Sequence, residues 1–227
     1  MDQPDLDEHR HRTALDGLAR VNWISRSSSI VWPAIARASK RKDGGRLRVL
    51  DVACGGGDVA IAVKNRAEKT GLPLDMAGCD ISNTALEYAA VHATEKRLNV
   101  HFFPANAVTD SLPDTYDVVM CSLFLHHLEE PDAISMLANM TQATRHMLIV
   151  NDLVRGRIGY WLALFGTRLL TRSHIVHVDG PLSVRSAFSV NEVMSLAKRA
   201  GLTGVRISRH WPQRFLLTWD SQMMSTR

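Results

Sequence analysis

Cysteine is scarce in this chain of 227 residues, and so are segments that direct a protein into or across a membrane. The three cysteines, Cys54, Cys79 and Cys121, are odd in number and lack Cys-x-x-Cys spacing, which argues against a disulfide framework and a structural zinc site. Residues 1–12 contain no apolar run of the kind that a secretory signal needs, and the longest apolar stretch, residues 158–170, is too short to span a bilayer. We therefore expect a soluble cytoplasmic protein without a membrane span.

Net charge is also small. The chain has 27 basic and 23 acidic residues, a net charge of +4 and a pI near 9.2, which is weak evidence for a nucleic-acid partner. Hydrophobic residues make up 45% of the chain and charged residues 22%, and these ordinary globular values exclude a disordered polymer. The length suits one large domain, or one domain that carries a cap.

Apolar strand-like runs alternate with helical spacing through the middle of the chain. This alternation predicts an α/β fold: a doubly wound, mostly parallel sheet of seven strands with helices on both faces. The last two strands are expected to form an antiparallel hairpin through residues 210–213. The predicted strands are 48–53, 73–80, 100–105, 116–122, 146–152, 203–209 and 214–220, and the main helices are 58–69, 83–96, 132–144 and 190–200.

Additional segments flank and interrupt this core. We predict an N-terminal helical cap over residues 1–45, a cofactor-binding core over 46–153 and a lid or substrate insertion over 154–188. Residues 189–221 then complete the sheet, and 222–227 form a tail. The cap is expected to contain helices at 9–23 and 28–38. Aromatic residues of the cap and lid either roof the carboxyl edge of the sheet or dock these helices on each other; they are Trp23, Trp32, Tyr160, Trp161 and Phe165.

A glycine-rich loop follows the first predicted strand and is the most informative segment of the sequence. Three consecutive glycines, residues 55–57, stand between a buried strand and a helix, where the backbone can approach a ligand closely. The pattern Gly55-x-Gly57-x-x-Ala60, with Asp80 further on, also fits a dinucleotide site. Asp51 shifts the balance, because a second carboxylate suits a ligand with one ribose and an ammonium group better than a pyrophosphate.

The run from Asp51 to Gly57 resembles the first motif of the class I S-adenosylmethionine-dependent methyltransferases, particularly the small-molecule enzymes of ubiquinone and menaquinone biosynthesis. Ala53 replaces the first glycine of that motif. The resemblance implies that S-adenosylmethionine is the cofactor, S-adenosylhomocysteine the product, and that the loop residues Asp51, Ala53, Cys54, Gly55 and Gly57 contact the cofactor.

The resemblance extends to the ends of the next strands. It implies that Asp80 binds the ribose hydroxyls, that Ile81 packs on the adenine, and that Asn106 and Ala107 lie at the adenine amino group. The segment 121–128 resembles the family's segment beside the sulfonium, which adds Cys121, Ser122 and His127 to the expected cofactor-binding residues. All of these positions follow strands at their carboxyl ends, where open α/β sheets bind ligands.

Candidates for the chemistry are harder to identify. His126, Asp152 and His177 are the candidate catalytic residues, although Asp152 also suits a helix cap and His127 a structural role. Candidate substrate contacts are Trp23, Arg26, Tyr160 and Trp161; Arg26 could instead reach the cofactor's carboxylate. The loop spacing of His174, His177 and Asp179 is more typical of a polar loop than of a metal site, so no metal is expected.

These residues together predict a methyltransferase that acts on a small aromatic or hydroxylated acceptor by O- or C-methylation. The alternatives are a NAD(P)-dependent oxidoreductase, which the glycine pattern permits, and a noncatalytic module that only binds the cofactor. A nucleic-acid methyltransferase is not favoured, because Cys121-Ser-Leu-Phe stands where its Asn/Asp-Pro-Pro-Tyr/Phe signature would be.

Overall fold

The computed structural model describes residues 27–41, 45–156, 159, 161 and 182–221. The strands are β1 (Leu47–Val52), β2 (Leu74–Asp80), β3 (Val100–Pro104), β4 (Tyr116–Ser122), β5 (Thr144–Leu153), β6 (Arg206–His210) and β7 (Arg214–Asp220). The helices are α2 (Ser27–Ser39), α3 (Asp58–Lys69), α4 (Asn83–Glu95), the 3-10 turn η1 (Leu125–His127), α5 (Glu130–Gln142) and α8 (Val190–Arg199).

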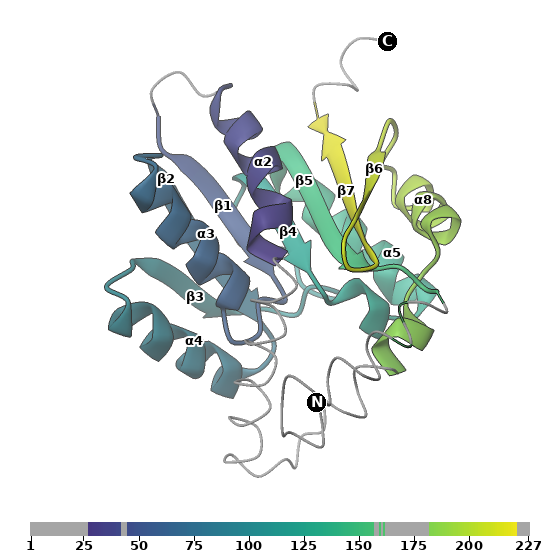
Figure 1. The fold of residues 1–227 in the computed structure, drawn as a ribbon, viewed down its shortest axis with the longest axis horizontal. Helices are drawn as coiled ribbons and strands as arrows, with labels where there is room; N and C mark the ends of the chain where they lie inside the picture. Colours follow the sequence, from purple (N-terminus) through teal and green to yellow (C-terminus); the bar gives the residue numbers. More distant parts are fainter. Residues whose placement is uncertain (1–26, 42–44, 157–158, 160, 162–181, 222–227) are drawn as a thin grey trace.

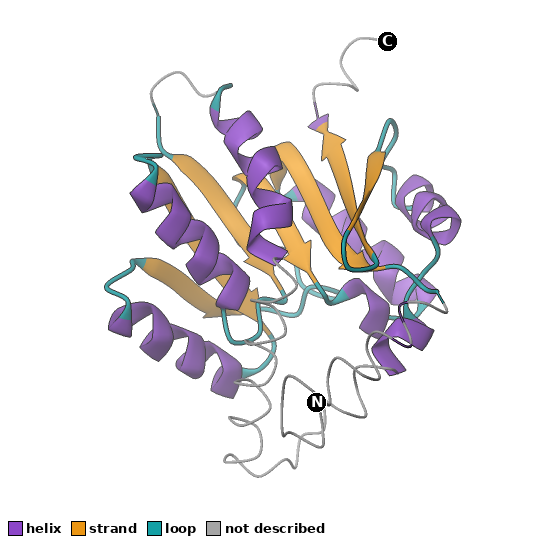
Figure 2. Cartoon of the chain, viewed as in Figure 1, coloured by secondary structure: helices purple, strands orange, loops and turns teal. Residues whose placement is uncertain are grey.

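Seven strands form one sheet in the order β3-β2-β1-β4-β5-β7-β6 (Figures 1 and 2). Strands β1 to β5 pair in parallel, whereas β7 runs antiparallel to both β5 and β6. The predicted doubly wound, mostly parallel sheet and its final hairpin are therefore confirmed. The hairpin turn contains a cis peptide bond between Trp211 and Pro212.

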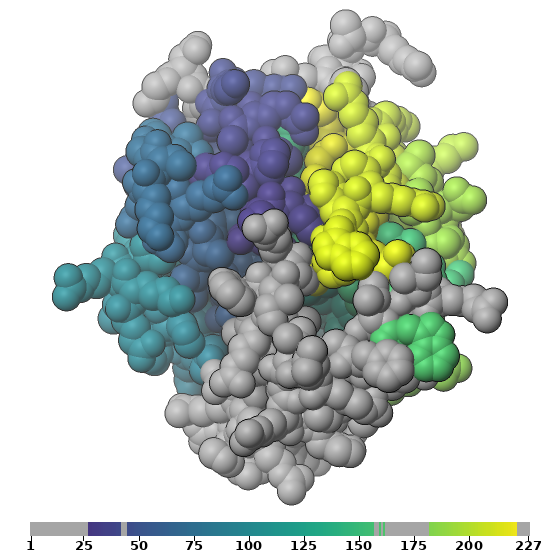
Figure 3. Space-filling model, in the orientation of Figure 1, coloured from purple at the N-terminus to yellow at the C-terminus, as the bar shows by residue number. Residues whose placement is uncertain are grey.

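Helices cover both faces of the sheet. One apolar cluster joins the sheet to α5 and α8, and a second joins it to α2 and α3. On the second face α2 lies between α3 and the β6–β7 hairpin (Figure 3). Strand residues alternate between the clusters, since Val150 belongs to the α5 side and Ile149 to the α2 side. This alternation fixes which polar side chains near the strand ends share a face.

Helix α2 is part of the core, although it falls within the segment 1–45 that was predicted as a cap. Ile30, Val31 and Ile35 are buried against the sheet. Trp32 is also buried, and the Arg66 guanidinium lies 5.0 Å from its ring centre. Of the two roles left open for Trp32, the structure favours helix packing over a roof on the carboxyl edge, because its position on α2 turns it toward α3. The predicted domain boundaries themselves stay predictions.

The sheet has two edges, β3 and β6. Strand β6 is mostly exposed and carries Arg206, Arg209 and His210, whereas the inner strand β7 is mostly buried. Strand β3 has five residues and ends at Pro104. None of the helices in the described ranges combines the length and apolar character needed to cross a bilayer.

Candidate functional site

The loop between β1 and α3 has an unusual backbone. Ala53, Gly55 and Gly57 adopt positive φ angles of 53°, 52° and 75°. A β-carbon at residue 57 would lie 2.9 Å from both Ala89 Cβ and Phe102 Cζ, so crowding as well as conformation requires glycine there. A β-carbon at residue 55 would meet nothing within 4 Å, which leaves that side of the loop open. Ala53 adopts the left-handed conformation without being glycine, which explains why the resembling family has glycine at this position.

Asp80 ties this loop to the end of β2. Its Oδ2 accepts the Gly55 N–H at 2.8 Å, and its Oδ1 accepts the Ser82 N–H at 2.9 Å. Each oxygen keeps a lone pair that can accept a hydrogen bond from a hydroxyl group. The neighbouring Ile81 is 72% exposed, so an apolar side chain stands in the open beside the carboxylate. This arrangement is compatible with a ribose on Asp80 and an adenine on Ile81.

Asp51 is a buried carboxyl group beside the same loop. Burial, together with the nearby charges of Asp80 and Asp58, raises the pKa of Asp51 to about 8, against a smaller lowering by the Ala60 N–H. Its Oδ1 has no hydrogen-bond partner, and neither Asp51 nor Asp80 forms an ion pair within the described residues. A cationic group placed here would relieve this concentration of negative charge. These carboxyl groups therefore fit a ligand that carries ammonium and sulfonium groups.

Asn106 lies in a rigid turn after β3. Its Oδ1 accepts the Val108 N–H at 2.9 Å, and its N–H donates to Asp110 Oδ2 at 2.7 Å. From α5, Asn139 Nδ2 donates to the carbonyls of Ala107 and Val108 at 3.1 and 3.0 Å. The turn is thus held from two sides. Sequence reasoning missed the supporting residues Asp110 and Asn139, which carry no motif of their own.

The predicted cofactor-binding residues at the end of β4 and in η1 differ in exposure. Cys121 is fully buried, which raises the pKa of its thiol, so only its backbone can face a ligand. Ser122 is half-buried, and its Oγ has no hydrogen-bond partner within the described ranges. His127 is exposed, with its ring 4.2 Å from that of His126. The cofactor contacts expected of these residues stay predictions.

His126 and Asp152 form a buried pair. His126 Nδ1 lies 2.6 Å from Asp152 Oδ1, and the His126 N–H donates to Asp152 Oδ2 at 3.2 Å. Burial alone would raise the pKa of Asp152, but the attraction and hydrogen bond of His126, the Leu153 N–H and the charge of Arg214 together lower it. The ionised carboxylate therefore accepts from Nδ1–H, which leaves Nε2 as the basic nitrogen of the ring. Sequence analysis proposed both residues separately, and the structure brings them together.

A second set of polar groups lies on the α2 face at the strand ends. Ser122 pairs with Asn151 across β4 and β5, and both amide atoms of Asn151 are buried without a hydrogen-bond partner in the described part of the chain. Arg214, at the start of β7, is buried and donates from Nη1 to Ser27 Oγ at 3.2 Å. Burial lowers the pKa of Arg214 to about 10, against an opposing effect of the Asp152 charge. We call Asp51, Ser122, Asn151 and Arg214 the polar row.

Several predicted residues cannot be placed. Trp23, Arg26, Tyr160 and the loop residues 174–179, which include His177, lie outside the described residues. Trp161 is described and is 54% exposed. In the part of the chain that the structure describes, no group of three or more His, Cys, Asp or Glu side chains could hold a metal ion.

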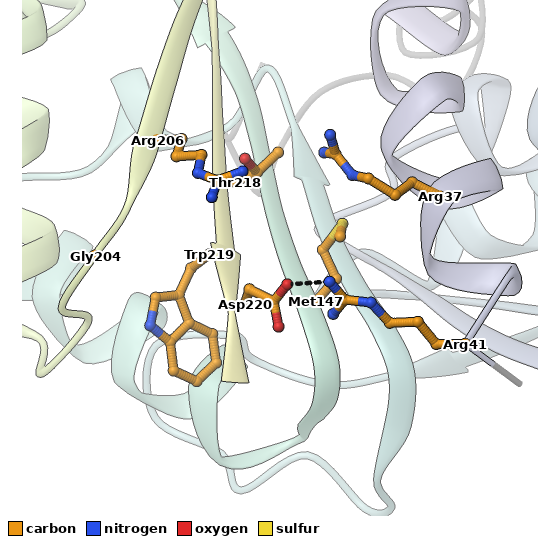
Figure 4. A pocket seen from close by; sticks show the side chains of 8 residues that line it. All are labelled: Arg37, Arg41, Met147, Gly204, Arg206, Thr218, Trp219 and Asp220. Carbon is orange, nitrogen blue, oxygen red and sulfur yellow. Dashed lines mark ion pairs between the residues drawn. The ribbon is translucent and has the colours of Figure 1, made fainter. Parts of the chain in front are cut away.

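A small basic pocket lies at the other end of the sheet. Arg37 of α2 and Arg41, in the turn after α2, face Thr218 and Asp220 of β7, and Arg41 pairs with Asp220 at 2.6 Å (Figure 4). Met147, which also lines the pocket, is near the amino end of β5, whereas Asp152 is near its carboxyl end. The pocket is therefore separate from the site described above.

Several known proteins are similar to this chain in sequence. Residues 49–146 match the family described as "Methyltransferase domain". Over 155 residues, the chain is 26% identical to the ubiquinone biosynthesis O-methyltransferase of Pseudomonas entomophila, covering 67% of this chain and 58% of that protein. The corresponding protein of Pseudomonas fluorescens Pf-5 is 24% identical over 186 residues, covering 81% and 70%. The chain thus spans 58% and 70% of the lengths of these two relatives.

A solved structure shares the fold over nearly the whole length of both chains. Magnesium protoporphyrin IX methyltransferase from Synechocystis PCC 6803, solved with bound SAH, superposes with a TM-score of 0.63 at 16% identity. The superposition covers 94% of this chain and 96% of that one. The strand order and the helices on both faces are therefore those of an established fold.

Proposed function

We propose that this chain is a class I S-adenosylmethionine-dependent methyltransferase that methylates a hydroxyl oxygen of a small aromatic acceptor, with His126 as the base. The match of residues 49–146 to the methyltransferase domain and the shared fold support this class of enzyme. The NAD(P)-dependent alternative gains no support from these comparisons. The observation that carries the choice of oxygen is the buried His126–Asp152 pair.

The cofactor site follows the carboxyl ends of successive strands. We assign Asp51 to the ammonium group, Asp80 to the ribose hydroxyls, and Ile81 with Asn106 to the adenine. The open side of Gly55 and the unpartnered Asp51 Oδ1 support these assignments. When bound, S-adenosylmethionine supplies a methyl group on a positively charged sulfonium, and the sulfur departs neutral.

The protein's own contribution is alignment and proton removal. A phenol is a weak nucleophile until it loses its proton, so a base at the attacking oxygen accelerates its methylation. Asp152 holds the proton on Nδ1 of His126 and stabilises the ring as it becomes positively charged. Nε2 can then take the phenolic proton as the oxygen attacks, while the low exposure of both side chains excludes water from the pair.

Relatives support an aromatic acceptor. The curated relatives are named O-methyltransferases of ubiquinone biosynthesis. An O-methyltransferase family 2 protein from Planctomyces limnophilus, solved in complex with apigenin, shares the fold with a TM-score of 0.63 at 18% identity. It covers 97% of this chain and 63% of that chain.

The first test is titration calorimetry with S-adenosylhomocysteine, NAD and NADP in parallel, followed by a methyl-transfer screen of phenols and quinols. We expect micromolar binding of S-adenosylhomocysteine alone and O-methylation of at least one phenol. His126→Gln should keep S-adenosylhomocysteine affinity and lose turnover of the same phenol. Binding of a nicotinamide nucleotide, or cofactor binding with no acceptor methylated, would contradict the proposal.

A further inference from the structure

We propose that the polar row binds the amino-acid head group of the cofactor, with Ser122, Asn151 and Arg214 receiving its carboxylate. This inference rests on the proposed function. It assigns Asn151 and Arg214, which no sequence motif marks, to a ligand.

The four side chains of the polar row lie on one face of adjacent strands. Asp51, Ser122, Asn151 and Arg214 belong to β1, β4, β5 and β7, which are neighbours in the sheet. Their alternation partners Val49, Met120, Ile149 and Leu216 all pack in the cluster shared with α2 and α3. The polar row therefore runs across the carboxyl edge on the α2 side, where Ser27 begins α2.

The row contains unmet hydrogen-bonding capacity. Asp51 Oδ1, Ser122 Oγ, Asn151 Nδ2 and Asn151 Oδ1 are all buried, and none has a hydrogen-bond partner among the residues that the structure describes. Burying such groups without a hydrogen bond destabilises a protein, so native structures rarely contain several of them together. Four such atoms on three neighbouring strands indicate a place that a polar ligand completes.

The distribution of charge along the row matches a zwitterion. A carboxyl group stands at the β1 end and a buried guanidinium at the β7 end, with a hydroxyl and an amide between them. Neighbouring strands lie about 4.8 Å apart, so β1 and β5 are separated by about 10 Å. A zwitterionic amino-acid head, with hydrogen bonds of about 2.9 Å on each side, suits this width. Its ammonium group would face Asp51, and its carboxylate would face the donors of Ser122, Asn151 and Arg214.

The test compares two ligands that differ only in the head group. S-adenosylhomocysteine carries the amino-acid head, whereas 5′-deoxy-5′-methylthioadenosine keeps the adenosine and the thioether but lacks it. Both are titrated calorimetrically into the wild type, Asn151→Leu and Ser122→Ala. Asn106→Ala, at the proposed adenine end of the cofactor site, is the matched reference, because it should weaken the binding of both ligands by a similar factor.

We expect Asn151→Leu to weaken the binding of S-adenosylhomocysteine about 10- to 100-fold, and Ser122→Ala to weaken it about 5- to 10-fold. The affinity of both variants for methylthioadenosine should stay within about twofold of the wild-type value. Asn151→Leu also removes an unsatisfied amide, so its melting temperature without ligand should not fall. If that variant does not fold, Ser122→Ala decides the question. Unchanged S-adenosylhomocysteine affinity, or equal weakening of both ligands, overturns the inference. A wild type that binds neither ligand contradicts the proposed function instead.

Discussion

Replacing Asp51 with Asn tests the electrostatic reasoning behind the cofactor site. The pKa of Asp51 is about 8 in the folded protein and about 3.9 in an unfolded chain. The folded state therefore keeps this proton between roughly pH 4 and pH 8 while the unfolded state loses it. A raised pKa of this kind stabilises the folded state at low pH, and the contribution is lost as the pH rises toward 8.

The size of the effect follows from the pKa difference. At pH 7 the unfolded chain is favoured by about 4 kcal/mol through ionisation of this one carboxyl group. Asparagine avoids that penalty, but its amide also needs partners in a buried place, so we expect a net gain of about 2 kcal/mol. For a chain of this length, that gain corresponds to a rise of about 4–8 °C in melting temperature.

The assay is thermal unfolding of ligand-free wild type and Asp51→Asn, followed by circular dichroism from pH 4 to pH 8. The two melting temperatures should approach each other near pH 4 and diverge steadily toward pH 8. Asp75→Asn is the control, because Asp75 is exposed and paired with Arg46, and its curve should show no such divergence. Equal melting temperatures of wild type and Asp51→Asn at pH 8 would refute the reasoning.

The same buried carboxyl group links cofactor binding to pH. With a pKa of about 8, roughly nine-tenths of Asp51 is protonated at pH 7. A cationic ligand favours the ionised form, so binding at pH 7 should release close to one proton. Calorimetry in buffers of different ionisation enthalpy measures this release, and it should disappear in Asp51→Asn.

Three further predictions concern other parts of the site. Asp80→Ala should abolish measurable S-adenosylhomocysteine binding in calorimetry while its circular dichroism stays native; unchanged affinity would rule out the ribose assignment. Asp152→Asn should lower kcat for a phenolic acceptor about 10²- to 10⁴-fold, because His126 loses the partner that holds the proton on its Nδ1. An unchanged kcat in this variant would show that the His126–Asp152 pair is not the base. Gly57→Ala should destabilise the protein by about 2 kcal/mol more than Gly71→Ala in denaturant unfolding, since both have positive φ but only residue 57 is crowded. Equal losses would show that conformation alone requires glycine there.

Much of the fold was predictable because local periodicity reports it directly. The glycine loop, the strand ends and the final hairpin all lie within two or three residues of their predicted positions. The packing of α2 was not predictable, because the spacing of its apolar residues indicates a buried face but not the surface that buries it. Trp32 shows this, since the same helix could have lain above the sheet edge or upon its face.

The candidate site, like the fold, was only partly predictable from the sequence. Asp51 lies in a continuous motif and Asp80 ends the next strand, so both could be proposed from the sequence. His126 and Asp152 are 26 positions apart, and only the pairing of β4 with β5 brings them within hydrogen-bonding distance. Asn151 and Arg214 were missed because their common face depends on β7 pairing antiparallel with β5, a register that no local pattern encodes.

The exposed strand β6 has a consequence for how copies of the protein meet. The open edge of a sheet is a template on which another strand can add, and long apolar edges promote aggregation. Here the edge presents Arg206 and Arg209, so a second copy docking strand to strand would bring like charges together. At the opposite edge, Pro104 ends a strand of only five residues and offers no N–H for pairing. Both features disfavour the addition of a further strand, so concentrated solutions should resist fibrous association.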